Sequence, residues 1–359
     1  MKRTLITVLL LLLLLPCAAQ GENEAEDDRN YRIVTQEQRL LTTYGGVPDV
    51  GDEYVAGDNG HYRVTAVDHT QKTASAEKLG VYEMPDVSWL RDDAQPVAAA
   101  KKAVALYCTH SDESYENVDG TSSDEKRGGI YDVAEQFKQA LEKRGITVYY
   151  SDETHFPHDA AAYRRSRATA AELVEDGVDA VMDIHRDGIP DPKQYEQTMK
   201  GEEITRVRLL VGRSNQNAET NKAFAAQIKA VADEMYPGLI KDIYIGKGTY
   251  NQDLMGQAVL LEFGTYTSDK QDVLSSTGYM ADVMEKALYG GVSGAAGGQK
   301  DAEAETTRGA FSGIIWALAA LVVGALIYAF AASGRAKPAL EKWKRGFQEM
   351  SGGLFGRKK

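Results

Sequence analysis

The chain has 359 residues, enough for two or three domains, and its hydrophobic content of 43% can supply a sizeable core. The formal net charge of −12 excludes nucleic acid as the main partner, because phosphate binding depends on clustered Lys and Arg. Only two cysteines are present, Cys17 and Cys108, and Cys17 lies in the predicted leader. The mature protein therefore cannot form an intramolecular disulfide.

Residues 1–20 have the pattern of a signal peptide. Met1-Lys-Arg3 is a basic start, Leu5–Leu15 is an apolar run, and small residues follow at Cys17-Ala-Ala19, where cleavage is expected. Two other interpretations remain, a lipidated Cys17 and an uncleaved N-terminal anchor. Pro16 argues against the first, and the shortness of the apolar run argues against the second.

Residues 31–80 are predicted to form a small antiparallel β-domain. Short runs of β-favouring residues alternate here with turn signals, such as the glycine pair at 45–46. His61 and His69 lie beside turns, so we interpret them as surface residues and not as ligands. The expected strands are Tyr31–Val34, Glu53–Val55, His61–Val67 and Thr73–Leu79.

Residues 98–290 show strands alternating with helices, a pattern typical of an α/β fold with a mostly parallel sheet flanked by helices. In the first helix, Ile130, Val133, Ala134, Phe137 and Leu141 recur at helical spacing and form one apolar face. The expected strands are Val104–Cys108, Thr147–Tyr150, Val178–Ile184, Arg206–Val211, Ile240–Ile245 and Gln257–Phe263. The expected helices are Ile130–Arg144, Asp159–Glu175, Asn217–Met235 and Ser268–Tyr289.

The C-terminal part is predicted to attach the chain to a membrane. Residues 291–309 are rich in Gly and Ala and then in charge, as in a flexible linker. Residues 310–332 form an uncharged apolar run that is long enough for a transmembrane helix. Because Lys and Arg are concentrated in residues 333–359, the positive-inside rule makes these residues a basic cytoplasmic tail. We therefore expect a single-pass protein of the cell membrane whose α/β domain, which carries the candidate catalytic groups, is extracytoplasmic.

Three of the expected α/β strands place a side chain capable of acid–base or metal chemistry at or near their carboxyl ends. His110 and Glu113 follow the first strand, His185 follows the third, and Glu262 lies near the end of the last. Ligands of open α/β sheets bind at the carboxyl ends of the strands, so we expect these residues to share one site. Two histidines and a glutamate suit zinc with one position left for water, and a further carboxylate can transfer protons. The sequence therefore predicts a zinc hydrolase centre, with Glu262 as the acid–base group.

Each of these residues also has an ordinary structural interpretation. A histidine after a strand is often a hydrogen-bonded loop residue, and Glu113 could cap the turn that follows it. Glu262 is harder to explain in this way, because an unpaired carboxylate within an apolar strand is costly to bury. Cys108 is interpreted as a buried strand residue.

Other polar residues stand close to the same strand ends. Asp183 and Asp187 flank His185, and either could orient its imidazole ring, although exposed aspartates are just as common. His155 and His158 form a second cluster. We place this cluster either at the mouth of the site or in an ordinary turn, and the turn is slightly favoured.

Seven short stretches then identify a family, within residues of about 100–290. They are Thr109–Tyr115, His158-Asp159 with Tyr163–Arg167, Asp183–Asp187, Val211–Asn215, Tyr236–Leu239, Tyr250–Leu254 and Leu260–Gly264. In this order they resemble the stage II sporulation protein P family of cell-wall hydrolases, which is related to the zinc N-acetylmuramoyl-L-alanine amidases. The set is specific, whereas each stretch alone is a weak signal.

The resemblance implies a fold like that of the zinc amidases and cleavage of the amide between muramic acid and L-alanine in peptidoglycan. It also implies endopeptidase action on cross-links and work beside stage II sporulation protein D during engulfment of the forespore. By the same resemblance, His110 and His185 are zinc ligands and Glu262 is the catalytic carboxylate. The family pattern His-x-x-Glu-Ser-Tyr favours Glu113 as the third ligand, whereas Glu125 stands at the distance seen in the wider amidase group. We choose Glu113.

Two features depart from the family pattern. The family usually has another histidine where Cys108 stands, so this chain lacks one polar neighbour of the site. Family members are typically anchored near the N-terminus, whereas the predicted membrane helix here is at residues 310–332, so the contacts within the membrane would differ.

A hypothesis of a different class is a catalytically silent scaffold that keeps the fold and binds the cell wall. A degenerate scaffold should have lost at least one of the candidate residues, and all of them are present. The enzyme is therefore the leading hypothesis. A zinc carboxypeptidase or another amide hydrolase would use similar groups and is not separated from it by spacing alone.

Overall fold

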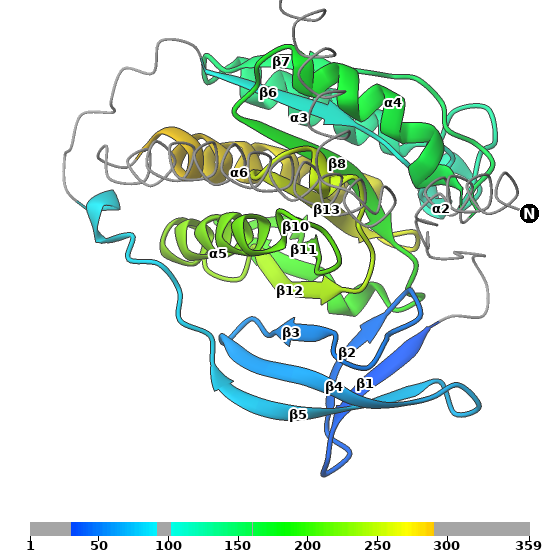
Figure 1. The fold of residues 1–359 in the computed structure, drawn as a ribbon. Helices are drawn as coiled ribbons and strands as arrows, with labels where there is room; N and C mark the ends of the chain where they lie inside the picture. Colours follow the sequence, from blue (N-terminus) through cyan, green and yellow to red (C-terminus); the bar gives the residue numbers. More distant parts are fainter. Residues whose placement is uncertain (1–29, 92–101, 160, 291–359) are drawn as a thin grey trace, which may run out of the picture. The chain divides into compact units, whose positions relative to one another are not determined.

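The computed structural model describes residues 30–91, 102–159 and 161–290, and its largest feature is an eleven-stranded sheet (Figure 1). The strand order is β2-β1-β5-β4-β3-β12-β11-β13-β8-β6-β7. The N-terminal strands are β1 (Tyr31–Thr35), β2 (Leu40–Tyr44), β3 (Glu53–Val55), β4 (Gly60–Asp68) and β5 (Thr73–Val81). The others are β6 (Ala103–Tyr107), β7 (Thr147–Tyr150), β8 (Ala180–Asp187), β11 (Val207–Gly212), β12 (Ile240–Gly246) and β13 (Ala258–Thr265).

The eleven-stranded sheet as a whole is mixed, although four of its five pairings within the predicted α/β domain are parallel, as the sequence predicted. Strands β7, β6, β8 and β13 run parallel to one another, but β13 pairs antiparallel with β11, and β12 follows the direction of β11. The connection from β12 to β13 explains this reversal. It contains only the short 3₁₀ helix η4 (Gln252–Leu254), whereas a parallel return needs a long crossover that usually contains an α-helix.

The N-terminal strands extend this sheet and do not form the separate antiparallel β-domain that the sequence predicted. Strand β3 pairs antiparallel with β12, with Tyr54 opposite Tyr244, and β1 pairs parallel with β5. Tyr44 stacks on Tyr244 with ring centroids 4.0 Å apart. The physical reason is that β12 would otherwise be an edge strand with unpaired backbone groups, and β3 satisfies them.

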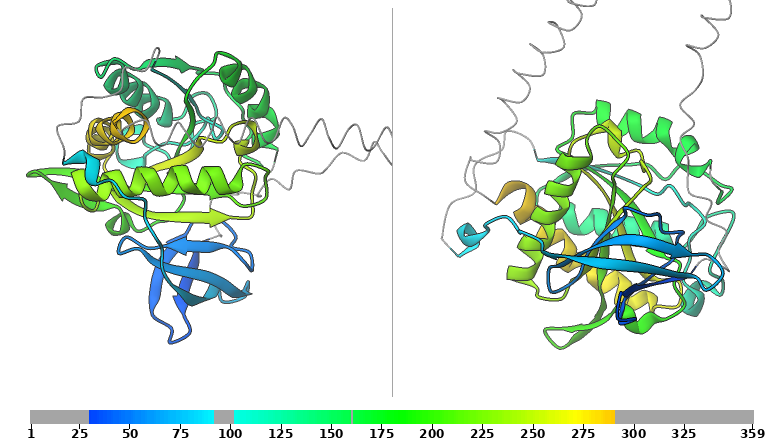
Figure 2. Two further views of the ribbon diagram at one scale, coloured as in Figure 1. Left: turned by 60° about the vertical axis from the view of Figure 1, so that its left-hand side comes forward. Right: turned by 60° about the horizontal axis from the view of Figure 1, so that its bottom comes forward.

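Helices cover both faces of the central strands. Alternate residues of β6 show this arrangement: Val104 and Leu106 belong to the apolar cluster shared with α3, α5 and α6, whereas Ala105 packs with Leu173 of α4. Figure 2 shows α5 and α6 side by side, in agreement with their contacts. The helices are α2 (Glu116–Asp119), α3 (Ile130–Glu142), α4 (Ala162–Glu175), α5 (Ala218–Met235) and α6 (Lys270–Tyr289). The four predicted helices are therefore present, with small changes at their ends.

The sequence did not predict the strand β2 or the hairpin of β9 (Glu196–Met199) and β10 (Glu202–Thr205), which contacts α6. It also did not predict the short helices α2, η2 (Ser88–Leu90), η3 (Pro192–Gln194) and η4. In the described residues, no helix combines the length and the apolar character that a membrane span requires. The predicted leader, linker, membrane helix and basic tail (residues 1–20, 291–309, 310–332 and 333–359) lie outside the described residues.

Candidate metal centre and acid–base residue

The carboxyl ends of β6 and β8 bring together the three residues that the sequence singled out as metal ligands. The two strands are parallel neighbours, so the loop after β6 lies beside the end of β8. That loop carries His110 and Glu113, and His185 lies near the end of β8. The potential ligand atoms of the three residues lie within 4.8 Å of one another, and all three side chains are buried.

Glu113 lies between the two imidazole rings. Its Oε1 atom is 3.3 Å from Nδ1 of His110 and 3.3 Å from Nδ1 of His185. Its other oxygen, Oε2, accepts a hydrogen bond from the backbone N–H of Arg186 at 2.9 Å. The backbone of Glu113 is also fixed, because its carbonyl accepts from the N–H of Ile130 at the start of α3. The start of α3 therefore fixes the backbone that carries this carboxylate.

This donor set fits zinc. A tetrahedral zinc ion with bonds of about 2.0–2.1 Å holds neighbouring ligand atoms about 3.3 Å apart. Oε1 of Glu113 has this spacing to both histidines. Two imidazoles and one carboxylate also leave the fourth position of a tetrahedral site open, as in catalytic zinc sites.

The charge state of Glu113 suits a cation. Burial opposes ionisation of this carboxyl, but His185 and His110 hold its pKa well below the ordinary value. The alternative ligand from the sequence, Glu125, is exposed and does not belong to the cluster. The geometry therefore favours Glu113 as the third ligand.

Asp183 occupies the position expected for a residue that orients His185. One of its oxygens lies 3.0 Å from Nε2 of His185, on the side of the ring away from Glu113, although the two groups are not aligned as a hydrogen bond. The Thr109 backbone N–H donates to the same carboxylate at 2.8 Å, and the Thr109 hydroxyl donates at 2.6 Å. A metal-binding histidine usually has such a partner on its second nitrogen.

The two histidines of the second cluster have different surroundings. His158 stacks on His110 with ring centroids 3.8 Å apart, and its Nδ1 is 3.2 Å from Asp112. His158 lines the same pocket as Glu113, His185 and Glu262, so it lies at the mouth of the site. The sequence slightly favoured the other interpretation, an ordinary turn. His155 is buried away from this pocket and bonds to the Cys108 carbonyl, which is a structural role.

Glu262 lies on β13 beside the metal cluster, because it is the strand partner of His185 on β8. The residue is 8% exposed. Burial, and next the neighbouring carboxylate of Asp187, raise the pKa of Glu262 to about 8, while Arg208 opposes this shift. A carboxyl group with this pKa can both accept and donate a proton near neutral pH.

Sequence reasoning missed two residues around Glu262, namely Arg208 and Tyr195. Arg208 is fully buried on β11, opposite Glu262 in the strand register. It donates to Asp187 at 2.8 Å and to Asp242 at 2.7 Å, and its Nη1 atom lies 3.5 Å from Glu262. The Tyr195 hydroxyl lies 2.8 Å from Asp187 and 3.2 Å from Glu262. A charged residue inside an apolar strand was the available signal for Arg208, whereas no local pattern marked Tyr195.

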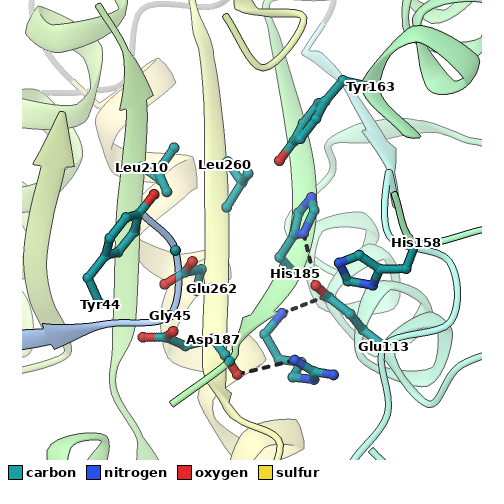
Figure 3. A pocket seen from close by; sticks show the side chains of 13 residues that line it. Tyr44, Gly45, Glu113, His158, Tyr163, His185, Asp187, Leu210, Leu260 and Glu262 are labelled. Carbon is teal, nitrogen blue, oxygen red and sulfur yellow. Dashed lines mark hydrogen bonds and ion pairs between the residues drawn. The ribbon is translucent and has the colours of Figure 1, made fainter. Parts of the chain in front are cut away.

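A pocket connects the metal cluster and Glu262 (Figure 3). In this view Glu113, His185 and His158 gather on one side, and Glu262 and Asp187 lie on the other. The end of β2 provides part of the wall through Tyr44 and Gly45. A side chain at position 45 would place its Cβ 2.5 Å from the Asp187 carboxylate, so only glycine lets the backbone approach this closely.

Asp242 gives a prediction about the pH dependence of stability. Burial opposes its ionisation, but Arg208 and Lys241 hold its pKa well below the usual range. A carboxyl group whose folded pKa is depressed stabilises the fold above its unfolded pKa of about 3.9, and this contribution is lost as the pH falls. We expect Asp242→Asn to lower the free energy of unfolding at pH 7, and the difference from wild type to shrink below about pH 4.

Urea unfolding followed by circular dichroism at pH 7, 5 and 3.5 would measure this difference. Asp176→Asn, at an exposed aspartate, is the control and should track the wild type at each pH. A difference for Asp242→Asn that stays constant or grows on acidification would contradict the prediction.

One known protein family matches most of this chain. The sequence profile of the family described as stage II sporulation protein P (SpoIIP) matches residues 26–285. Stage II sporulation protein P of Bacillus subtilis (strain 168) is 29% identical over 218 residues, which cover 55% of this chain and 54% of that protein. The chain thus spans about half the length of this curated relative.

Two solved structures that are weakly similar to this chain are amidases. The CwlD amidase of Clostridioides difficile, in complex with the GerS lipoprotein, has a TM-score of 0.36 at 15% identity, with 52% of this chain and 98% of that chain covered. The catalytic domain of CwlV, an N-acetylmuramoyl-L-alanine amidase of Bacillus (Paenibacillus) polymyxa var. colistinus, has the same values. At TM-scores this low, the likeness supports no conclusion about the fold.

Proposed function

The chain belongs to the stage II sporulation protein P family, and from this premise we propose that it is a zinc-dependent peptidoglycan hydrolase of sporulation. The proposed reaction is cleavage of the amide between muramic acid and L-alanine, as in an N-acetylmuramoyl-L-alanine amidase, with endopeptidase action on cross-links as a second activity. The curated relative in Bacillus subtilis bears the family's name, which supports the assignment to sporulation.

One observation carries the proposal: Glu113 and His185 of the buried His110–Glu113–His185 cluster line the same pocket as the buried carboxyl of Glu262. The three clustered residues would hold zinc. Zinc bound by such a set lowers the pKa of a coordinated water towards 7 and polarises the carbonyl under attack. Asp183 would keep the ring of His185 in orientation from its second nitrogen.

Glu262 would transfer the protons of the reaction. With a pKa of about 8, its carboxylate form can accept a proton from the attacking water, and its acid form can deliver a proton to the leaving amine. The Tyr195 hydroxyl and the Arg208 guanidinium lie at its second oxygen and would hold the carboxyl in position. A catalytically silent scaffold would have no need for an ionised carboxylate at Glu113 close to a protonatable carboxyl at Glu262.

The same proposal includes a place and a partner. A leader at residues 1–20 and a membrane helix at residues 310–332 would hold the described part of the chain on the outer side of the cytoplasmic membrane, next to the wall. Stage II sporulation protein D is the proposed protein partner, because the family resemblance implies joint work during engulfment.

The test is to incubate the purified full-length chain with isolated sacculi and to measure both bound zinc and released fragments. About one zinc per chain, together with free muramic acid ends and peptides that begin with L-alanine, would support the amidase. Zinc without release, also after addition of stage II sporulation protein D, would favour the scaffold. Release that survives complete removal of zinc would refute the zinc mechanism.

His185→Ala should remove the metal, because two of the three proposed ligands cannot complete a catalytic zinc site. We expect bound zinc, measured by mass spectrometry after exhaustive dialysis, to fall from about one per chain to nearly none. His61→Ala is the matched control, since His61 pairs with Glu53 on the N-terminal strands and lies outside the pocket. Equal zinc contents in the two variants would exclude His185 as a ligand.

A further inference from the structure

A second cavity, of about 330 Å³, lies where β2 and β4 meet the segment between β8 and β11. None of its lining residues belongs to the metal cluster, and Glu262 is not among them. We call it the basic cavity, because four of its lining residues are cationic and only Asp58 is acidic. The four cations are Arg39, Lys193, Arg206 and Lys241.

Two of these cations lack a counter-charge in the described residues. The Nε atom of Arg206 is buried and has no hydrogen-bond partner there. Lys193 is exposed at the rim and forms no ion pair with any described carboxylate. The chain as a whole carries a net charge of −12, so this concentration of positive charge is local. Buried, unpaired polar groups are costly unless a partner satisfies them, so the cavity favours an anionic ligand.

The walls of the basic cavity indicate the kind of anion. Tyr54, Tyr62 and Leu41 provide apolar surface beside the charges, and Leu40 is 44% exposed at the opening. Carboxylates joined by short carbon chains match this mixture of charge and apolar surface, and Arg binds carboxylates with paired hydrogen bonds. A linear polyphosphate would need an open row of cations, whereas the four cationic residues here line a single cavity.

The cavity is held in shape by the segment that carries Lys193. The Gln194 side chain accepts a hydrogen bond from the backbone N–H of Thr43 at 3.1 Å and donates to the Thr43 hydroxyl at 3.0 Å. The backbone N–H of Arg206 donates to the Tyr195 carbonyl at 2.7 Å. Both cations therefore stand on backbone that is tied to its neighbours, which lowers the entropy cost of binding.

Two side chains, Thr42 and Arg208, link the basic cavity to the acid–base residue. Thr42 lines the cavity, and its hydroxyl accepts from Arg208 at 2.9 Å and from Lys241 at 3.0 Å. The same guanidinium of Arg208 lies 3.5 Å from Glu262. A ligand in the basic cavity would thus be connected to Glu262 through Thr42 and Arg208.

We propose that the basic cavity binds the carboxylates of an acidic peptide. The identity of that peptide rests on the proposed function: it is the stem peptide of peptidoglycan, whose γ-D-glutamyl and diaminopimelyl residues carry free carboxylates. The cavity would hold part of the substrate away from the scissile amide, so it determines which stem peptides bind.

The experiment uses the full-length chain and the soluble tripeptide L-alanyl-γ-D-glutamyl-meso-diaminopimelic acid, which contains no muramyl amide to cleave. Isothermal titration calorimetry should detect binding that weakens as salt increases. Arg206→Gln and Lys193→Gln should each raise the Kd by about tenfold, the loss expected for one charge-assisted contact. Lys143→Gln removes an equal charge from an exposed site at the end of α3 and should leave the Kd unchanged.

Three results would overturn the proposal: no binding of the tripeptide, equal binding by the Arg206 and Lys193 variants and the wild type, or stronger binding of a glycerol-phosphate oligomer at the same residues. Hydrolysis of sacculi is measured separately. Tripeptide binding that depends on Arg206 without any hydrolysis would keep the cavity assignment and refute the proposed function. Hydrolysis of sacculi, with tripeptide binding that neither variant changes, would keep the proposed function and refute the cavity assignment.

Discussion

Replacing Glu262 by glutamine should lower the rate of peptidoglycan hydrolysis by at least about a hundredfold and leave the bound zinc unchanged. Glutamine keeps the shape of the side chain but can neither accept nor donate the proton of a carboxyl group. The residue does not belong to the metal cluster, so loss of its charge should not release the ion. The rate of release of peptides from sacculi, together with zinc content, measures both effects.

Glu125→Gln is the matched control for this variant. Glu125 is exposed, and the wider amidase group suggested it as an alternative ligand. We expect it to retain both zinc and activity. Normal digestion of sacculi by Glu262→Gln would show that another group transfers the protons. Loss of zinc in Glu125→Gln would instead show that the third ligand was wrongly chosen.

Arg208→Met should give the largest loss of stability among single substitutions around the site. Arg208 is fully buried and neutralises the carboxylates of Asp187 and Asp242, with Glu262 close by. Removing one partner of a buried ionic network leaves uncompensated charge, which costs about 3–5 kcal/mol. Urea unfolding at pH 7, followed by circular dichroism, would measure the free energy of unfolding.

Two further variants control the comparison. Arg91→Met breaks an ion pair with Glu234 at the surface, where Arg91 is 72% exposed, and should change stability little. Arg208→Lys keeps a positive charge but loses the forked contact, so its loss should be smaller than that of Arg208→Met. If Arg208→Met unfolds at the same urea concentration as Arg91→Met, the buried network does not stabilise the fold as we infer.

Local sequence patterns predicted the α/β elements well. The apolar face of Ile130–Glu142 and the apolar runs of β6, β8 and β13 depend only on neighbouring residues, and these elements are all present. Strand direction does not depend on local residues in this way. The reversal between β13 and β11 follows from a connection without an α-helix, and the pairing of β3 with β12 joins residues far apart in the sequence. The hairpin of β9 and β10 is polar and lacks a clear alternation.

The candidate site also has a part that the sequence predicted and a part that it did not. The positions of His110 and His185 after apolar strands were enough to predict that they lie together, because parallel neighbouring strands end at the same edge of a sheet. The surroundings of Glu262 were not predicted. Arg208 lies opposite Glu262 on the neighbouring antiparallel strand, and Tyr195 contacts Glu262 from the segment after η3 (Pro192–Gln194). The charge of Arg208 within an apolar strand marks it as unusual, but neither residue's contact with Glu262 can be read from a single sequence.

The pairing of β3 with β12 has a consequence for the architecture of the protein as a whole. The wall at Tyr44 and Gly45 closes the pocket over Asp187, and it comes from the N-terminal strands and not from the half that carries the ligands. A shortened chain that began at β6 would keep every proposed ligand, yet it would lose that wall and expose the edge of β12 to pairing with other chains. The N-terminal strands are therefore not a detachable accessory, because they complete both the central sheet and the wall of the pocket.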